Sequence, residues 1–278
     1  MLELKFDENY DGQGISKGIQ RGLLPYLDGK LIVQEGMGIG AFAIQDKNRT
    51  YFCSIDKITE ENASGKVMVV QYQIDRRLDW MFLNRPSSAL TTFLELAASK
   101  CYMKAEAFQG PLLKMGTLFR KLFGIRIDFR KIQSLGKITA KYTIKQSDVY
   151  IEVDCKSTCK DYKLFVMNEI GGELFSQAVV DGGEASPPTG WQRVEKSGID
   201  DKRSHMLTSA SLGVAFYMEE LEVPKNIESK LFWGREVSGG YNWAGFESEI
   251  KCLENGFSGY SYKICFENHT QGVERCAR

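Results

Sequence analysis

The most regular pattern of apolar and polar residues in the chain lies between residues 137 and 155. In the range 137–145 apolar residues occupy every second position, and the range 149–155 repeats this alternation after a turn at 146–148. A period of two residues is typical of a strand with one buried and one solvated face. The sequence therefore predicts an antiparallel hairpin here.

Similar strand-like segments run through most of the chain and are separated by turns rich in Gly, Asp and Asn. They cover residues 2–6, 15–24, 31–34, 41–45, 50–55, 67–74, 164–167, 212–218 and 260–266. Many short strands of this kind indicate a sandwich or a barrel. We expect a mainly β protein, a large antiparallel β-sandwich of the supersandwich kind, with residues 1–278 in a single domain. The alternative is two smaller β domains joined by a helical bridge.

Helical spacing of apolar residues occurs in one part of the chain, at about residues 87–123. One apolar stripe runs from Leu90 to Cys101 and a second from Met115 to Phe123, with Gly110 and Pro111 between them. A helix that is apolar on one face must bury that face against another element. We therefore predict a two-helix insertion that covers one face of the sheet.

Composition and charge narrow the classes of function. The formal net charge is zero, which argues against a nucleic-acid partner. No apolar run approaches the roughly 20 residues of a transmembrane segment. The first residues alternate like a strand and do not resemble a signal peptide. We expect a cytoplasmic protein whose 7 cysteines are reduced and mostly buried.

Two patterns resemble cofactor or metal motifs but lack the context that such sites need. The run from Gly36 to Gly40 is glycine-rich, but a strand-like segment follows it, whereas a phosphate-binding loop needs a helix there. Cys155 and Cys159 are spaced like zinc ligands, but no second pair of ligands accompanies them. We expect neither a cofactor nor a bound metal.

The stretch from Trp233 to Phe246 is the strongest candidate for a binding site. It places aromatic residues among four glycines, as in a loop that approaches a ligand closely. Aromatic rings stack on sugar rings, and Arg or Glu side chains bond to hydroxyl groups. We predict a small-molecule or glycan ligand and expect Trp233 or Trp243 to be partly exposed. The predicted ligand-binding residues are Trp191, Trp233, Arg235, Tyr241 and Trp243; the competing interpretation is that these aromatic residues belong to the core.

If the protein is an enzyme, acid/base chemistry by carboxyl groups suits the sequence better than a covalent nucleophile. The chain has only 2 histidines and no nucleophile-elbow motif. The predicted catalytic residues are Glu236, Glu173 and His205. Ordinary polar loops are the alternative interpretation for Glu173 and His205.

The second hypothesis is an interaction protein without enzymatic activity. Residues 112–131 are rich in Lys and Arg beside the second apolar stripe. A basic amphipathic helix binds proteins or anionic membrane surfaces. This patch therefore offers a protein or membrane-surface contact, although an ordinary solvated helix face has the same pattern.

Overall fold

The computed structural model describes residues 2–6, 21–33, 38–46, 49–60, 67–82, 85–86, 126–194, 205–238 and 241–268. In this part of the chain the regular structure is entirely β, and no helix there is long and apolar enough to cross a membrane. The predicted mainly β protein with a large antiparallel sheet is confirmed. The predicted two-helix insertion at 87–123 lies outside the described residues.

The described residues form nineteen strands. They are β1 (Leu2–Lys5), β2 (Leu24–Leu27), β3 (Lys30–Leu31), β4 (Ile39–Asp46), β5 (Arg49–Glu60), β6 (Val67–Phe82), β7 (Arg85–Pro86), β8 (Arg126–Lys131), β9 (Gly136–Lys145), β10 (Asp148–Ser157), β11 (Tyr162–Gly171), β12 (Gln177–Val180), β13 (Gly183–Ala185), β14 (Gly190–Arg193), β15 (His205–Ser209), β16 (Val214–Glu222), β17 (Ile227–Ser238), β18 (Tyr241–Cys252) and β19 (Gly256–Asn268).

Most of these strands belong to one 16-stranded sheet, in the order β13-β12-β15-β16-β19-β10-β9-β6-β5-β4-β11-β18-β17-β14, with β7 and β8 paired to β6. A separate three-stranded sheet, β1-β2-β3, contributes Leu2 and Leu4 to the same core. The two strands at the ends of this order, β13 and β14, follow each other directly in the sequence. The sheet therefore nearly closes on itself.

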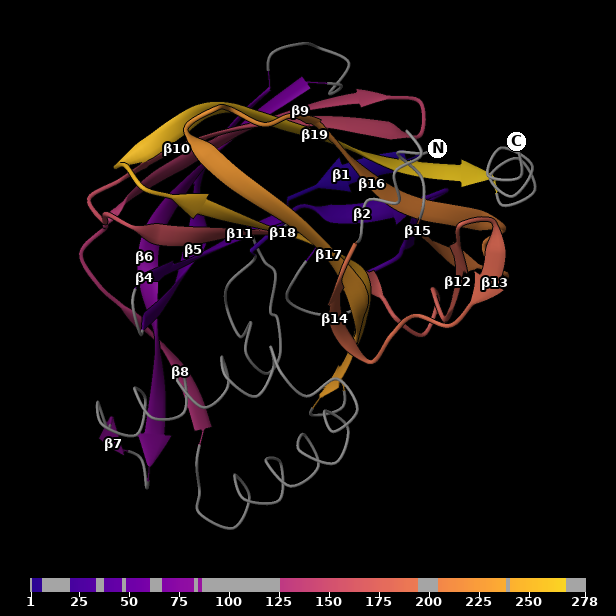
Figure 1. The fold of residues 1–278 in the computed structure, drawn as a ribbon, viewed down its shortest axis with the longest axis horizontal. Helices are drawn as coiled ribbons and strands as arrows, with labels where there is room; N and C mark the ends of the chain where they lie inside the picture. Colours follow the sequence, from indigo (N-terminus) through magenta and orange to yellow (C-terminus); the bar gives the residue numbers. More distant parts are fainter. Residues whose placement is uncertain are drawn as a thin grey trace.

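The long sheet folds over into two facing layers. In Figure 1, β9, β10, β16 and β19 lie above β4, β5, β11 and β18. Hydrogen bonds join strands that are far apart in the sheet order: the Tyr262 hydroxyl on β19 donates to Asn168 Oδ1 on β11 at 3.2 Å, and the Tyr260 hydroxyl on β19 bonds to Ser248 Oγ on β18 at 2.8 Å. The layers therefore pack as a sandwich.

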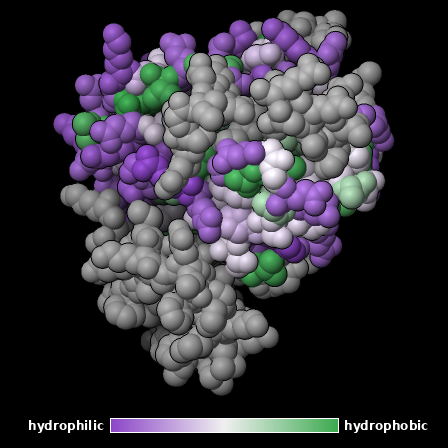
Figure 2. Space-filling model, turned by 45° about the vertical axis from the view of Figure 1, so that its right-hand side comes forward, coloured by the Kyte–Doolittle hydropathy of each residue, from purple (hydrophilic) through white to green (hydrophobic). Residues whose placement is uncertain are grey.

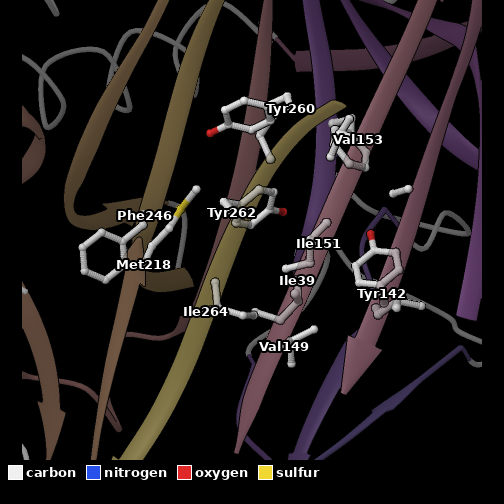
Figure 3. Packing of buried hydrophobic residues seen from close by; sticks show 14 of the residues in the cluster. Ile39, Tyr142, Val149, Ile151, Val153, Met218, Phe246, Tyr260, Tyr262 and Ile264 are labelled. Atoms are coloured by element: carbon white, nitrogen blue, oxygen red, sulfur yellow. The ribbon is translucent and has the colours of Figure 1, made fainter. Parts of the chain in front are cut away.

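The space between the layers is filled by apolar and tyrosine side chains. Figure 3 shows residues from both layers meeting there, among them Tyr142, Ile151, Met218, Phe246 and Ile264. All of these side chains are buried. The tyrosine hydroxyls bond to one another or to buried polar groups, as buried hydroxyls must; Tyr72 and Tyr142, for example, are 2.7 Å apart.

The most regular sequence pattern forms the predicted hairpin. Strands β9 and β10 pair in register from Lys145 and Asp148 onward, and Gln146 takes a positive φ of 59° in the turn. In contrast, the prediction of a helical basic patch over 112–131 is wrong for its last part. Residues 126–131 form strand β8, which pairs with the second half of β6, because the alternation from Arg126 to Lys131 fits a strand beside a long partner.

The Asn168 side chain is a polar link between the layers, and its removal tests the sandwich. Its Oδ1 also accepts the backbone N–H of Gly40 at 3.0 Å. We expect Asn168→Ala to lower the free energy of unfolding by roughly 2–4 kcal/mol, because two buried donors lose their partner. Urea denaturation measures this. Tyr262→Phe, which removes one hydroxyl, should lower it by only about 1 kcal/mol; equal small losses in both variants would contradict the bridging role.

Candidate functional site

The aromatic and glycine-rich stretch from Trp233 to Phe246 is a hairpin and not the predicted loop. Strands β17 and β18 pair from Ile227 and Cys252 to Ser238 and Tyr241. Its glycines lie where neighbouring backbones come close. A Cβ on Gly234 would lie 2.0 Å from the carbonyl oxygen of Gly190, and one on Gly245 would lie 2.2 Å from that of Asn168. Tight strand packing therefore explains these two glycines.

Strand alternation divides the predicted site residues between the two faces of this sheet. Trp233 belongs to the buried core between the layers, so residues at every second position from it share this inner face. The Arg235 Nε donates to Asn242 Oδ1 at 2.8 Å on the same side. Glu236 and Trp243 are direct partners in the register and lie on the outer face. Trp191 is the partner of Gly234 and lies there too.

Of the remaining predicted residues, His205 and Glu173 lie away from this outer-face group. His205 on β15 contacts the inner-face Trp233, with ring centroids 4.8 Å apart. Burial lowers the pKa of His205, and the charge of Asp181 offsets part of this decrease. Glu173 is exposed in the turn after β11. Tyr241 pairs with Ser238 at the end of the hairpin. The structure thus brings together Trp191, Glu236 and Trp243.

The outer face has a bare centre at two glycines. Gly234 on β17 and Gly245 on β18 are cross-strand partners. The same row of register partners continues across the sheet to Trp191 on β14 and to Glu169 on β11. Neither glycine has a side chain to fill the middle of this row. A tryptophan and a carboxyl group therefore flank two positions that have no side chain.

Two further rows border this glycine pair. The row on one side contains Glu236 and Trp243, and the row on the other contains Phe232, Glu247 and Met167. Three glutamates from three strands therefore surround the pair, and we call Glu169, Glu236 and Glu247 the acidic cluster. Trp191 donates a side-chain hydrogen bond to Glu236. The cluster combines aromatic rings and carboxyl groups on one sheet face.

Burial raises the pKa of all three carboxyl groups. For Glu169 the pKa lies well above its usual value because of burial and the charges of Glu236 and Glu247, while Arg21 lowers it in part. For Glu236 burial raises the pKa and the bond from Trp191 lowers it. For Glu247 burial and the charges of Glu249 and Glu236 raise the pKa to about 8. At neutral pH the cluster therefore holds protons and offers both donors and acceptors.

Two of these glutamates were not among the predicted site residues. Glu169 and Glu247 follow the strand alternation of β11 and β18, which places them on the face of Glu236. Reading the stretch as a strand would have found Glu247. The pairing of β11 with β18 spans a long sequence separation, so the approach of Glu169 has no local signal.

Arg21 sits beside the acidic cluster. Its guanidinium lies over the rings of Phe52 and Phe129, at 4.2 Å and 4.4 Å from their centroids, and its charge lowers the pKa of Glu169 in part.

Across the described ranges, no group of three His, Cys, Asp or Glu side chains has the arrangement of a metal site.

No protein-family model matches the sequence, and no curated protein matches it significantly. Two solved structures from Enterococcus faecalis are similar: a protein in glycosyl hydrolase family 38, with a TM-score of 0.38 and 11% identity, and an α-mannosidase of strain V583, with a TM-score of 0.37 and 10% identity. Each match covers 100% of this chain but only 31% and 30% of the other chains, so this chain spans about a third of their length. Such scores carry no argument about function.

The expectation that Trp233 or Trp243 is partly exposed is wrong, because they are only 5% and 7% exposed. Trp191, in contrast, is half-buried. We expect the fraction of tryptophan fluorescence that iodide quenches to fall most in Trp191→Phe. Trp233→Phe and Trp243→Phe are the matched controls, and a larger loss in either would contradict this assignment.

The raised pKa of Glu247 predicts a pH-dependent stability. The folded protein keeps this proton up to about pH 8, whereas an unfolded glutamate loses it near pH 4.3. Burial of this carboxyl therefore destabilises the fold progressively as the pH rises from about 4.3 to 8. Glu247→Gln should raise the free energy of unfolding by roughly 1–3 kcal/mol at pH 8.5 and by little at pH 4.5. Urea melts at both values measure this, with Glu228→Gln on the exposed side of β17 as control; an equal change at both pH values would contradict it.

Proposed function

We propose that the protein binds a carbohydrate through the outer face of strands β11, β18, β17 and β14. The observation that carries this proposal is the grouping of Trp191, Glu236 and Trp243 around the Gly234–Gly245 pair. These residues come from three strands, so a rigid sheet positions them. Rigid backbones hold binding groups more accurately than loops do.

The chemistry of this group suits a sugar ring. A tryptophan ring packs against the apolar C–H face of a sugar, and Trp191 is half-buried. Glu236 and Glu247 are also half-buried. Sugar hydroxyls both donate and accept hydrogen bonds, so a cluster of carboxyl groups in which Glu247 keeps its proton at neutral pH matches them.

The same carboxyl groups would carry acid/base catalysis if the ligand is also a substrate. Glycoside hydrolysis uses one carboxylic acid and one carboxylate on either side of the glycosidic bond. In this proposal Glu247, which keeps its proton at neutral pH, is the acid. Glu236 is the base or nucleophile. Of the three predicted catalytic residues, only Glu236 belongs to this arrangement.

Binding can be tested by calorimetric titration with a panel of neutral oligosaccharides. We expect Trp191→Ala and Glu236→Gln each to weaken the affinity at least about tenfold, since each removes a main contact of the ligand. The exposed Glu173→Gln is the matched control and should leave the affinity unchanged. Equal affinities in all three variants, or no binding to any oligosaccharide, would refute the proposal.

A further inference from the structure

Two pairs of cations face each other directly across neighbouring strands. Arg76 on β6 is the register partner of Lys131 on β8. Lys137 on β9 is the register partner of Lys156 on β10. Like charges placed directly opposite each other destabilise an antiparallel sheet. Four cations in such pairs therefore weaken this part of the sheet unless an anion lies between them.

The two pairs lie next to each other because both border β6. Lys137 is the partner of Gln73, which precedes Arg76 by three residues. The register between β5 and β6 shifts at Asp75, and this extra residue turns Gln73 and Arg76 toward the same outer face. Three residues of a strand span roughly 10 Å.

The connection between β8 and β9 fixes this arrangement. It follows β6 through backbone hydrogen bonds from Ile132 to Asp75 at 2.8 Å and from Leu135 to Ile74 at 2.9 Å. The ends of β8 and β9 that contain Lys131 and Lys137 are thereby held against one strand. We call Arg76, Lys131, Lys137 and Lys156 the basic strip.

The charges of the strip are largely uncompensated by neighbouring acids. Lys131, Lys137 and Lys156 are exposed, and among the described residues none of them forms an ion pair. Arg76 lies 3.8 Å from Asp75, whose carboxylate already accepts the Ser54 hydroxyl at 2.7 Å.

We propose that the basic strip binds an anionic polysaccharide, with sulfate or uronic carboxylate groups between the paired cations. Such a polymer places negative groups at intervals along a flexible chain, and ammonium and guanidinium groups bind them by charge-assisted hydrogen bonds. The partner relieves the repulsion within both cation pairs at once.

Two other anionic partners fit the described surface less well. Single-stranded nucleic acids bind to exposed aromatic rings beside the cations, and in the described ranges Phe6 is the one aromatic residue among the large exposed apolar side chains. Membrane association uses exposed apolar residues, but Leu221, Val223 and Leu253 lie on other strands and turns. Among the coloured residues of Figure 2, apolar ones form only small separate groups on the face shown.

The strip shares no residue with the proposed sugar site, so each can fail without the other. The experiment uses the full chain and fluorescein-labelled heparin as the probe, with binding followed by anisotropy at several salt concentrations. We expect Lys131→Gln/Lys137→Gln to weaken binding at least about tenfold and to reduce the slope of log affinity against log salt by about one to two. Lys225→Gln/Lys251→Gln, which removes two exposed lysines elsewhere, is the matched control and should change the affinity less than twofold.

Several outcomes would overturn the proposal: equal losses in both double variants, no binding by the wild type at low salt, or binding to an uncharged polysaccharide such as dextran as strong as to heparin. Stronger competition by single-stranded DNA or by vesicles with anionic lipid than by heparin would also overturn it and would assign the strip to that partner. Thermal melts control for folding. Because one cation of each pair is removed, the melting temperature of Lys131→Gln/Lys137→Gln should not fall.

Discussion

The fold depends on one buried amide that holds the two layers in a fixed alignment. Asn168 accepts hydrogen bonds from the backbone of β4 and from Tyr262 of β19, and its Nδ2 lies 3.5 Å from the sulfur of Met218 on β16. Four strands that are not all neighbours in the sheet thus meet at a single side chain. An apolar residue of the same size would fill the volume but would leave these donors unsatisfied.

This interior contact also fixes part of the outer face. Gly40 has a φ of 70°, and a Cβ there would lie 2.1 Å from the Tyr142 hydroxyl, so the bend at the start of β4 requires glycine. The preceding Gly38 accepts the backbone N–H of Glu169 at 3.0 Å. Glu169 follows Asn168 in the sequence and points to the opposite face. The alignment of the layers and the position of the acidic cluster are therefore set by neighbouring residues.

The acidic cluster lowers the stability of the fold. Burial raises the pKa of all three carboxyl groups, and the charge of Glu236 adds to this for Glu169 and Glu247. The described contacts that moderate this are Arg21 near Glu169 and the hydrogen bond from Trp191 to Glu236. Residues that work against the stability of a fold are often retained for binding or catalysis. The paired cations of the basic strip also lower the stability of the sheet.

Sequence patterns predicted those parts of the structure that local alternation determines. One face of the 136–157 hairpin is exposed to solvent and the other is buried, so apolar and polar residues alternate in its sequence with a period of two. The stretch from Trp233 to Phe246, predicted as a loop, lacks a two-residue period because both faces of its second strand are buried: Trp243, Ala244 and Phe246 are all buried. The acidic cluster depends on which distant strands pair, and a single sequence contains no local signal for that choice.

The pairing of distant segments also has a consequence for how the chain assembles. Gly40 and Asn168, which bond between β4 and β11, are 128 positions apart, and β10 pairs with β19 at the far end of the chain. Closing such long loops is entropically expensive before the contacts form, so folds of this type reach the native state slowly. During synthesis, β4 must wait for β11 to emerge from the ribosome, and β10 must wait for β19. We expect the hairpin β9–β10 to form first, because a tight turn joins its strands.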